Sequence, residues 1–318
     1  MFARALPDKT VLVALGALAA AAAAYLAVGA RGDLGFILMF RGSKLLALIT
    51  VAVAVAVSTV VFQTLSNNRI LTPSIMGFDA LYLLIQTALV FFLTGLGFAY
   101  LDPFSKFALD TGMMLGASFL LFGTLLRNSR DLSRMILTGI IFGVLFRSLT
   151  GLLNRMIDPS EFSVVQSASF ARFNSVNADL TWLAAGITLL VTGWLIYRHR
   201  TLDVIALGRE TAINLGVNHD REARHLLALV ALLVSVSTAL VGPVVFFGLL
   251  AAALTYQVAG TWRHIVLLPL SGLIAATILV GAQTLFERVL RLQTSVSVVI
   301  DALGGLAFLY LILRKASR

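Results

Sequence analysis

The sequence has no cysteine and few charged residues. None of its 318 residues is cysteine, and only 12% are Asp, Glu, Lys or Arg, whereas soluble domains average about 25%. The absence of cysteine excludes disulfides, thiolate catalysis and cysteine-based metal sites. The scarcity of charge leaves too little polar surface to keep a monomeric chain in water, so we do not expect a soluble globular protein.

The sequence also lacks the short motifs of common catalytic and nucleotide-binding sites. It has no HExxH, no GxSxG and no GxxxxGK[ST] pattern. The four histidines are His199, His219, His225 and His264. They are not spaced with acidic residues as a zinc site requires, and we interpret them as loop residues. The sequence therefore predicts no catalytic residue, metal site or cofactor in this chain.

Long apolar stretches make up most of the chain. Apolar residues account for 59% of it, and the mean hydropathy is +0.96. A helix that crosses a bilayer needs roughly 20 mostly apolar residues. Candidate spans lie at about 10–29, 43–62, 79–98, 109–126, 134–153, 180–197, 225–242, 243–259, 264–286 and 296–313. These ten stretches predict an all-α polytopic membrane protein with ten transmembrane helices.

Polar segments between the predicted spans are short. The longest, about 154–179 and 198–224, each have fewer than 30 residues, too few for an independent soluble domain. We therefore expect residues 1–318 to form a single transmembrane domain. If both termini are cytoplasmic, 15 of the 24 lysines and arginines lie in cytoplasmic segments and eight lie outside. This excess matches the positive-inside rule and predicts both termini in the cytoplasm.

One apolar stretch is too long for a single span. Read as one helix, the 36 residues from His225 to Gly260 would be about 54 Å long, against a hydrocarbon core of about 30 Å. The pair Gly242-Pro243 lies inside this stretch, and Gly-Pro is a natural turn. We therefore predict two spans, joined by a tight turn at this pair.

Residues 63–79, which follow the second predicted span, are unusually polar. They read QTLSNNRILTPSIMGFD. Polar side chains and a proline at membrane depth indicate backbone that is not continuous helix, which is tolerated where it is buried in protein or lines a cavity. One interpretation is an ordinary turn with an asparagine cap. The other is a broken helix lining a translocation pathway, to which Gln63, Asn68 and Pro73 would contribute.

Residues 198–224 form the longest predicted cytoplasmic loop, and they read RHRTLDVIALGRETAINLGVNHDREAR. The pattern predicts two short amphipathic helices. Their apolar residues are Leu202, Ile205 and Ala206 in the first, and Ala212, Leu215 and Val217 in the second. Gly208 and Gly216 stand where each helix could end. The pair either lies on the membrane surface or docks a soluble partner.

Ionisable residues inside apolar spans are costly in lipid and usually face a cavity or a partner. Arg147, within the fifth span, either lines a pathway or extends its guanidinium to the interface. Asp301, in the tenth, is expected to be paired or to cap a helix. Asp79 and Asp110 are expected at helix starts, where a carboxylate complements the helix dipole.

These segments resemble the permease family of bacterial ABC importers for iron–siderophore complexes and vitamin B12 (FecCD/BtuC-like). Residues 205–217, IALGRETAINLGV, are similar to the family pattern LALGxxxAxxLGV. Gln63, Asn68, Pro73 and Gly77 match the pattern QxxxxNxxxxPxxxG. The family's Arg-x-x-Arg before helix 2 is matched by Arg41 and Lys44, and VGPVVFFGL at 241–249 is a weakened VGxxGFVGL. The segment NRILTPSIMGFD at 68–79 resembles the corresponding segment of those ferric-siderophore permeases that pair with a second, different permease.

The chain also departs from the family pattern. The Pro-His that commonly follows the FVGL stretch, and the arginine after it, are replaced by Ala252-Ala253 and Tyr256. Gly304-Gly305 is retained near the last helix, but Leu306 stands where a proline usually follows. These departures leave the expected fold unchanged and fit one half of a heterodimer.

The resemblance implies a BtuC-like type II ABC importer permease in the bacterial inner (plasma) membrane. Its implied partners are a second permease (a heterodimer before a homodimer), two ATPase subunits, and a periplasmic or lipid-anchored siderophore-binding protein. Three groups of residues follow from the resemblance, and Arg147 joins the third as an ionisable residue inside a span. The ATPase-coupling group is Asp203, Leu207, Gly208, Glu210, Leu215 and Gly216; the docking group for the binding protein is Arg41, Lys44, Arg288 and Arg291; the pathway group is Gln63, Asn68, Pro73 and Arg147.

Other functions remain open. Vitamin B12 or haem is an alternative substrate within the same family. An ion-coupled secondary transporter is an alternative of a different class, but such proteins use buried acids in mid-membrane, and the two ionisable candidates here, Arg147 and Asp301, both lie off the centre of their spans. An intramembrane enzyme or scaffold has no catalytic constellation in its support.

Overall fold

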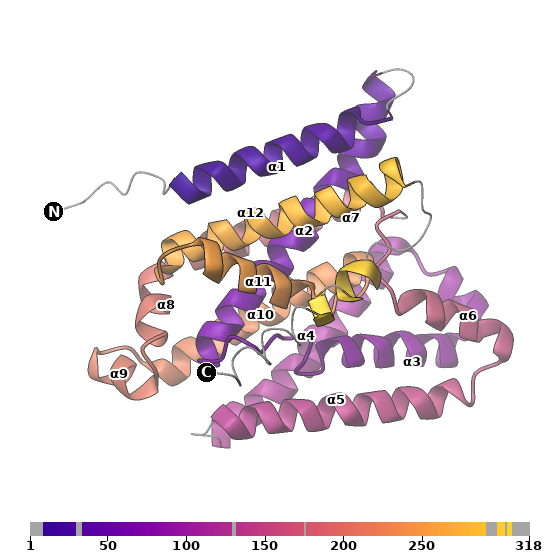
Figure 1. Cartoon of the computed structure of the whole chain (residues 1–318). Helices are drawn as coiled ribbons and strands as arrows, with labels where there is room; N and C mark the ends of the chain where they lie inside the picture. Colours follow the sequence, from indigo (N-terminus) through magenta and orange to yellow (C-terminus); the bar gives the residue numbers. More distant parts are fainter. Residues whose placement is uncertain are drawn as a thin grey trace.

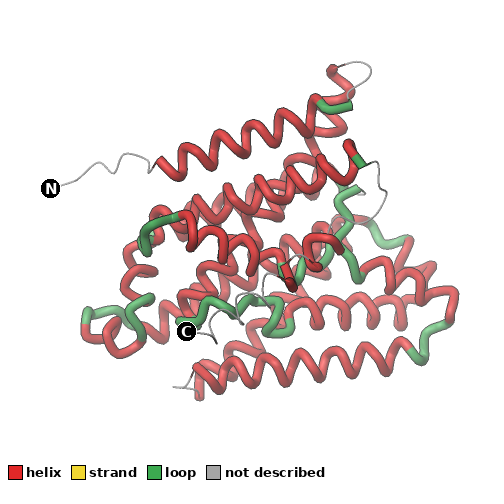
Figure 2. The backbone as a smooth tube through the Cα atoms, in the orientation of Figure 1, coloured by secondary structure: helices red, strands yellow, loops and turns green. Residues whose placement is uncertain are grey.

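The computed structural model describes residues 9–29, 34–128, 132–174, 176–290, 298–302 and 304–306. Within these ranges the chain is helical and contains no strand (Figure 2). The elements are α1 (Lys9–Ala27), α2 (Leu34–Leu65), α3 (Phe78–Ala99), α4 (Pro103–Asn128), α5 (Leu132–Asn154), α6 (Pro159–Ala168), α7 (Ala178–Tyr197), α8 (His199–Ile205), α9 (Arg209–Asn214), α10 (His219–Val241), α11 (Phe247–Val258), α12 (His264–Gln283) and the π-helical turn η1 (Thr284–Val289). The expected all-α fold is confirmed.

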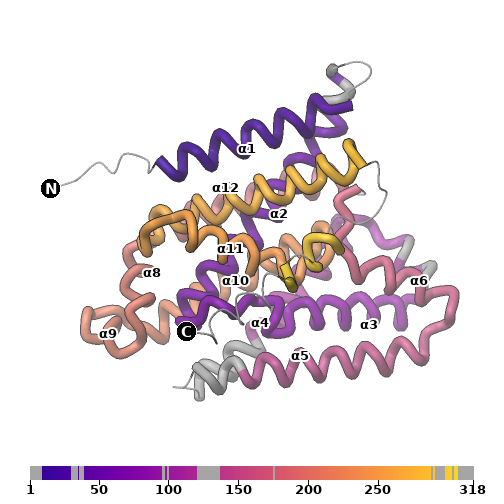
Figure 3. Tube along the Cα trace, viewed as in Figure 1, coloured from indigo at the N-terminus to yellow at the C-terminus, as the bar shows by residue number. Residues whose placement is uncertain are grey.

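The long helices run in broadly the same direction, side by side, with short elements at the two ends (Figure 1). The short helices α8 and α9 protrude from one end, which we call the α8–α9 end. The short helix α6 and the turn η1 lie toward the other, which we call the α6 end. Figure 3 traces the same path by residue number. Segments distant in sequence therefore meet at each end of the bundle.

The centre of the bundle is α2. It packs against α12, α10, α7 and α11, and 72% of the residues in its most apolar stretch are buried. A helix that is apolar on all sides belongs in the interior. The alternating run Val51–Val57, which resembles a strand by periodicity, is helical and largely buried, because only a closed barrel could use strands in lipid.

Two long helices, α1 and α5, lie at the edges of the bundle (Figure 1). In their apolar stretches, only 6% of the residues of α1 and 11% of those of α5 are buried. On α5 the outward side chains include Leu137, Ile141 and Val144. Apolar area of this extent costs about 25 cal/mol per Å² in water, so a bilayer or another membrane protein must cover these faces.

The predicted spans agree with the helices for most of the chain. Each of the first nine overlaps a helix, and in eight of these cases the helix has at least 19 residues, whereas most of the tenth span, 296–313, lies outside the described residues. Six described helices are long and apolar enough to cross a membrane, so the number ten stays a prediction.

The helix expected at 243–259 is shorter than predicted. The turn at Gly242-Pro243 is confirmed, since α10 ends at Val241, but α11 begins only at Phe247 and has 12 residues. It therefore extends about 18 Å and does not by itself match a hydrocarbon core of about 30 Å.

Candidate functional site

The α8–α9 end carries two short helices joined by a glycine. Leu202 and Ile205 of α8 and Ala212 of α9 are at most 2% exposed and pack into the core. Gly208 and Gly216 follow the two helices with φ of 94° and 82°, a region that favours glycine. The predicted pair of short amphipathic helices, each ended by a glycine, is therefore confirmed.

The opposite side of this pair is apolar and exposed. Leu207, Ile213 and Leu215 are 60%, 46% and 58% exposed, and Glu210 and Gly216 lie beside them on the surface. Of the apolar residues expected on the second short helix, Ala212 is buried, whereas Leu215, which directly follows α9, is exposed. We call Leu207, Ile213 and Leu215 the tip cluster.

Ion pairs tie this loop to the first turns of α10. Arg198 Nη2 lies 2.7 Å from Glu222 Oε1, and Arg209 Nη2 lies 3.1 Å from Asp220 Oδ2. Exposed pairs of this kind contribute only about 0–1 kcal/mol each. The first pair joins the start of the loop to α10, and the second joins its middle, at the start of α9, to α10, so the tip cluster is presented on a defined framework.

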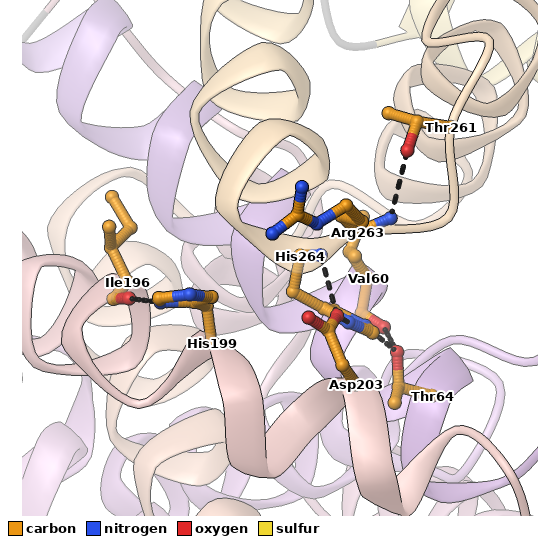
Figure 4. A network of polar contacts seen from close by, with 8 residues as sticks. All are labelled: Val60, Thr64, Ile196, His199, Asp203, Thr261, Arg263 and His264. Atoms are coloured by element: carbon orange, nitrogen blue, oxygen red, sulfur yellow. Dashed lines mark hydrogen bonds and ion pairs between the residues drawn. The ribbon is translucent and has the colours of Figure 1, made fainter. Parts of the chain in front are cut away.

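A buried polar network joins α8 to two long helices (Figure 4). Asp203 Oδ1 on α8 accepts from the backbone N of His264 at 2.8 Å and lies 2.7 Å from its ring Nδ1. The other ring nitrogen, Nε2, lies 2.7 Å from Thr64 Oγ1 on α2. His264 is 2% exposed, so its interpretation as a loop residue is wrong. Its burial could not be read from the sequence, where it follows a polar segment.

A cavity of about 500 Å³ lies beside this network. Residues from three segments line it, among them Gln63, Arg69, Asp203, Tyr256, Trp262 and His264. The Arg69 guanidinium lies 4.0 Å from the ring centroid of Trp262 and 5.1 Å from that of Tyr256, a cation–π arrangement. From the sequence, Tyr256 was noted only as a departure from the family pattern, and Trp262 was not singled out, because it lies in a short segment without a motif.

Residues 66–77, the middle of the polar segment 63–79, form a non-helical connection between α2 and α3. Asn68 Oδ1 accepts from the backbone N of Ile70 at 3.0 Å, as in an ordinary asparagine-capped turn. Gln63 is 2% exposed and donates to the Arg69 carbonyl at 2.7 Å, whereas its Oε1 has no hydrogen-bond partner among the described residues. Pro73 is buried. Of these three, Gln63 lines the cavity.

The end of this connection packs tightly on α5. Gly77 has φ of 97°, and a Cβ there would lie 2.9 Å from the Cα of Gly143, so no other residue fits without movement. Arg147, one turn further along α5, is exposed and does not line the cavity. The structure therefore does not bring Arg147 together with Gln63.

At the α6 end, Arg41 and Lys44 bind partners within the chain. Arg41 is 7% exposed and donates to carbonyl oxygens at the end of α1, with Nη1 2.8 Å from Leu26 O and 3.0 Å from Val28 O. Lys44 Nζ lies 2.5 Å from Glu287 Oε2. To dock a binding protein, both would have to exchange these contacts. Arg291 lies outside the described residues, and the side chain of Arg288 is not among them.

Three further acidic residues, expected at helix starts or as caps, differ in how they are placed. Asp301 Oδ1 accepts from the backbone N of Phe246 at 3.0 Å, so the expectation that it caps a helix is confirmed. Asp79 lies in the first turn of α3, as expected. Asp110 does not begin a helix, because α4 already starts at Pro103; its side chain is 1% exposed.

Comparison with known proteins identifies the family. The model of the FecCD transport family matches residues 10–314. This chain belongs to the FecCD transport family. It is 41% identical to the petrobactin import system permease protein of Bacillus subtilis over 286 residues, which cover 89% of this chain and 90% of the relative. With the petrobactin import system permease protein of Bacillus anthracis it shares 36% identity over 274 residues, 85% of this chain and 77% of the relative.

A solved structure has the same fold. A metal-chelate type ABC transporter in an inward-facing conformation superimposes with a TM-score of 0.84 at 21% sequence identity, covering 97% of this chain and 99% of that chain. At this identity the likeness concerns the fold alone. Members of the FecCD family are transport permeases. The apolar outer faces of α1 and α5 are therefore surfaces of a membrane protein, which lipid or another subunit covers.

Proposed function

We propose that this chain is a membrane-spanning subunit of an ATP-driven importer for iron(III)–siderophore complexes. In this proposal a separate ATPase docks on the α8–α9 end, which faces the cytoplasm. The observation that carries it is the tip cluster: three large apolar side chains are 46–60% exposed at a loop tip, outside any long apolar helix. Such a cluster, held by ion pairs and by a buried network, fits a partner protein better than lipid.

The chain's part in transport is mechanical. ATP binding in the partner would move the α8–α9 loop, and α8 would carry this motion to the long helices. The cavity bounded by Gln63, Arg69 and Trp262 would then open or close toward the cytoplasm. Alternating access needs no catalytic residue in this chain, and the residues supply only surfaces, a cavity and rigid connections.

Similarity to other permeases supports a ferric siderophore as substrate. The two permeases named above, 41% and 36% identical, belong to petrobactin import systems. The vitamin B12 import system permease protein of Klebsiella pneumoniae is 28% identical, and a hemin transport system permease protein of Yersinia pestis is 27% identical. Vitamin B12 and haem are therefore weaker candidates.

A second permease is the proposed occupant beside α5. Arg147 lies on the exposed face of α5, together with large apolar side chains such as Val144 and Leu145. A charge facing hydrocarbon is costly, whereas one at a subunit interface or water-filled pathway is common. The proposed heterodimer would place Arg147 at the boundary with the other permease, in the plasma membrane.

Deleting the gene in its native host tests the substrate. Uptake of radiolabelled iron should fall to background when supplied as ferric petrobactin and be restored by the intact gene, whereas vitamin B12 uptake should not change. Loss of vitamin B12 or haem uptake with intact siderophore uptake would reverse the substrate assignment. Normal uptake of all three would remove the importer proposal.

A further inference from the structure

One side chain, His264, joins α8 to α2 and α12 through polar contacts. Among the described residues, no other side chain does so. His264 is the first residue of α12, it is 2% exposed, and its ring lies between Asp203 of α8 and Thr64 of α2 (Figure 4). Each of the two ring contacts measures 2.7 Å. One imidazole therefore links three helices.

We propose that His264 is the joint that transmits motion of α8 to α2 and α12. The proposal rests on the proposed function, because it assumes that a partner moves the α8–α9 loop. His264 is in this sense a positioning residue. It touches neither substrate nor ATP, and it fixes how far α2 and α12 follow α8.

The geometry favours a joint over simple apolar packing. Apolar contacts are non-directional, so Leu202 and Ile205 alone would let α8 slide over its neighbours. Hydrogen bonds weaken steeply when bent or stretched. The His264 side chain is only 3% exposed, so water does not readily replace a lost partner of its ring, although Asp203 on the cavity side is 30% exposed. Short contacts on both sides of the ring therefore resist relative movement of α8, α12 and α2.

Asp203 strengthens the connection because it also caps α12. The N–H groups of the first helical turn have no partner within the helix, and Asp203 Oδ1 accepts the one from His264 at 2.8 Å. A carboxylate at a helix N-terminus also complements the helix dipole. Displacing α8 would therefore uncap α12 and break the ring contact at the same time.

The two helices on the far side of the joint are those that dominate the interior. The helix α2 packs against α12, α10, α7 and α11, and α12 packs against α1, α2 and α11. Movement of these two helices changes the packing of most of the bundle. The joint also borders the cavity, since Thr64, Asp203 and His264 all line it. Motion at the joint therefore changes the shape of that cavity directly.

The test uses the complete importer complex in proteoliposomes, with variants at each side of the ring. Thr64→Val keeps the shape of the side chain and removes its hydroxyl group, whereas Thr64→Ser keeps the hydroxyl. His264→Ala removes the ring. His199→Ala is the matched control, because His199 begins α8 near the same end and its Nδ1 lies 2.9 Å from the Ile196 carbonyl oxygen of α7 (Figure 4). Among the described residues it makes no hydrogen bond to α2 or α12.

Three quantities are measured for each variant: retention of the ATPase during purification, the rate of ATP hydrolysis, and ferric petrobactin transported per ATP. We expect His264→Ala and Thr64→Val to retain the ATPase and to hydrolyse ATP, with transport per ATP reduced about tenfold, a usual size for coupling between sites. Thr64→Ser and His199→Ala should stay within about twofold of the wild type. If the His264→Ala complex fails to assemble, the comparison of Thr64→Val with Thr64→Ser still tests whether the contact to the ring couples ATP hydrolysis to transport.

A second measurement follows the motion itself. The chain has no cysteine, so spin labels can be attached to cysteines introduced at Ala206, after α8, and at Thr261, which precedes α12, before the labelled chain is assembled with its partners. With an intact joint, the distance between the labels should be the same without nucleotide and with ATP. In His264→Ala the two distances should differ.

Three outcomes would contradict the proposal that His264 is the joint. The first is unchanged transport per ATP in Thr64→Val and His264→Ala, and the second is loss of the ATPase from Thr64→Val. The third is a distance between the labels that changes with nucleotide in the wild-type background. Leu207→Asp separates this failure from failure of the proposed function. If Leu207→Asp loses the ATPase while Thr64→Val is normal, the docking proposal stands and the joint falls. If Leu207→Asp transports normally, the docking proposal itself is wrong.

Discussion

At the scale of single residues, the basic side chains at the α6 end serve the fold. Four carbonyl oxygens at the end of α1 accept from Arg41, those of Tyr25, Leu26, Val28 and Gly29. The last carbonyls of a helix lack partners within it, and a cation there interacts favourably with the helix dipole. The resemblance to the permease family implies a docking role for Arg41 and Lys44, and the sequence does not reveal that α1 ends beside them.

Replacing Arg41 with alanine should therefore lower stability. Loss of charge-assisted bonds to buried carbonyls is expected to cost about 1–3 kcal/mol. Thermal unfolding of the purified chain in detergent measures this, with Arg155→Ala as control, since Arg155 is exposed. A pure docking residue would behave differently: Arg41→Ala would then melt like the wild type and bind the loaded binding protein weakly.

Gly77 offers a second test at this scale. Its φ of 97°, and the 2.9 Å that would separate an added Cβ from Gly143 Cα, make Gly77→Ala destabilising by about 1–3 kcal/mol. Gly186→Ala in α7 is the matched control, because a Cβ there meets no atom within 4 Å, and alanine favours a helix more than glycine. Equal melting temperatures for the two variants would show that the Gly77–Gly143 contact is not tight.

At the scale of elements, apolar length and glycine position predict the helices well. The ends of α8 and α9 follow from Gly208 and Gly216, and nine predicted spans overlap helices. The short α6 was not predicted, although Pro159 and Glu161 in its first turn are start signals. The network at His264 could not be predicted, because it joins residues 64, 203 and 264, whose proximity depends on the packing of three helices.

The exposed face of α9 should be needed for docking. Replacing Ile213 and Leu215 with aspartate puts two charges into an apolar contact, and charge buried without a partner is strongly unfavourable. We expect the double variant to insert in the membrane and to lose the ATPase during purification. Asn214→Asp adds a charge between them on the same exposed helix, and it should reduce retention far less. Full retention in the double variant would exclude this face as the docking surface.

At the scale of the whole molecule, the two ends of the bundle should lie on opposite sides of the membrane. Because the chain has no cysteine, single cysteines at the exposed Arg221, which lies at the α8–α9 end outside the tip cluster, and at Ser160, at the α6 end, add one labelling site each. In intact cells a membrane-impermeant maleimide should label the cysteine at Ser160 and not the one at Arg221. In inside-out vesicles the pattern should reverse. Labelling of both from one side would contradict the orientation.

The central claim is that ATP hydrolysis by a partner docked on the α8–α9 end drives substrate through this chain. Reconstituting the chain with its ATPase, second permease and binding protein in proteoliposomes tests it most directly. Radiolabelled ferric petrobactin should accumulate when ATP is present on the side of the ATPase, and should not when a non-hydrolysable analogue replaces ATP. Accumulation driven by a proton or sodium gradient, with the ATPase omitted, would contradict the account.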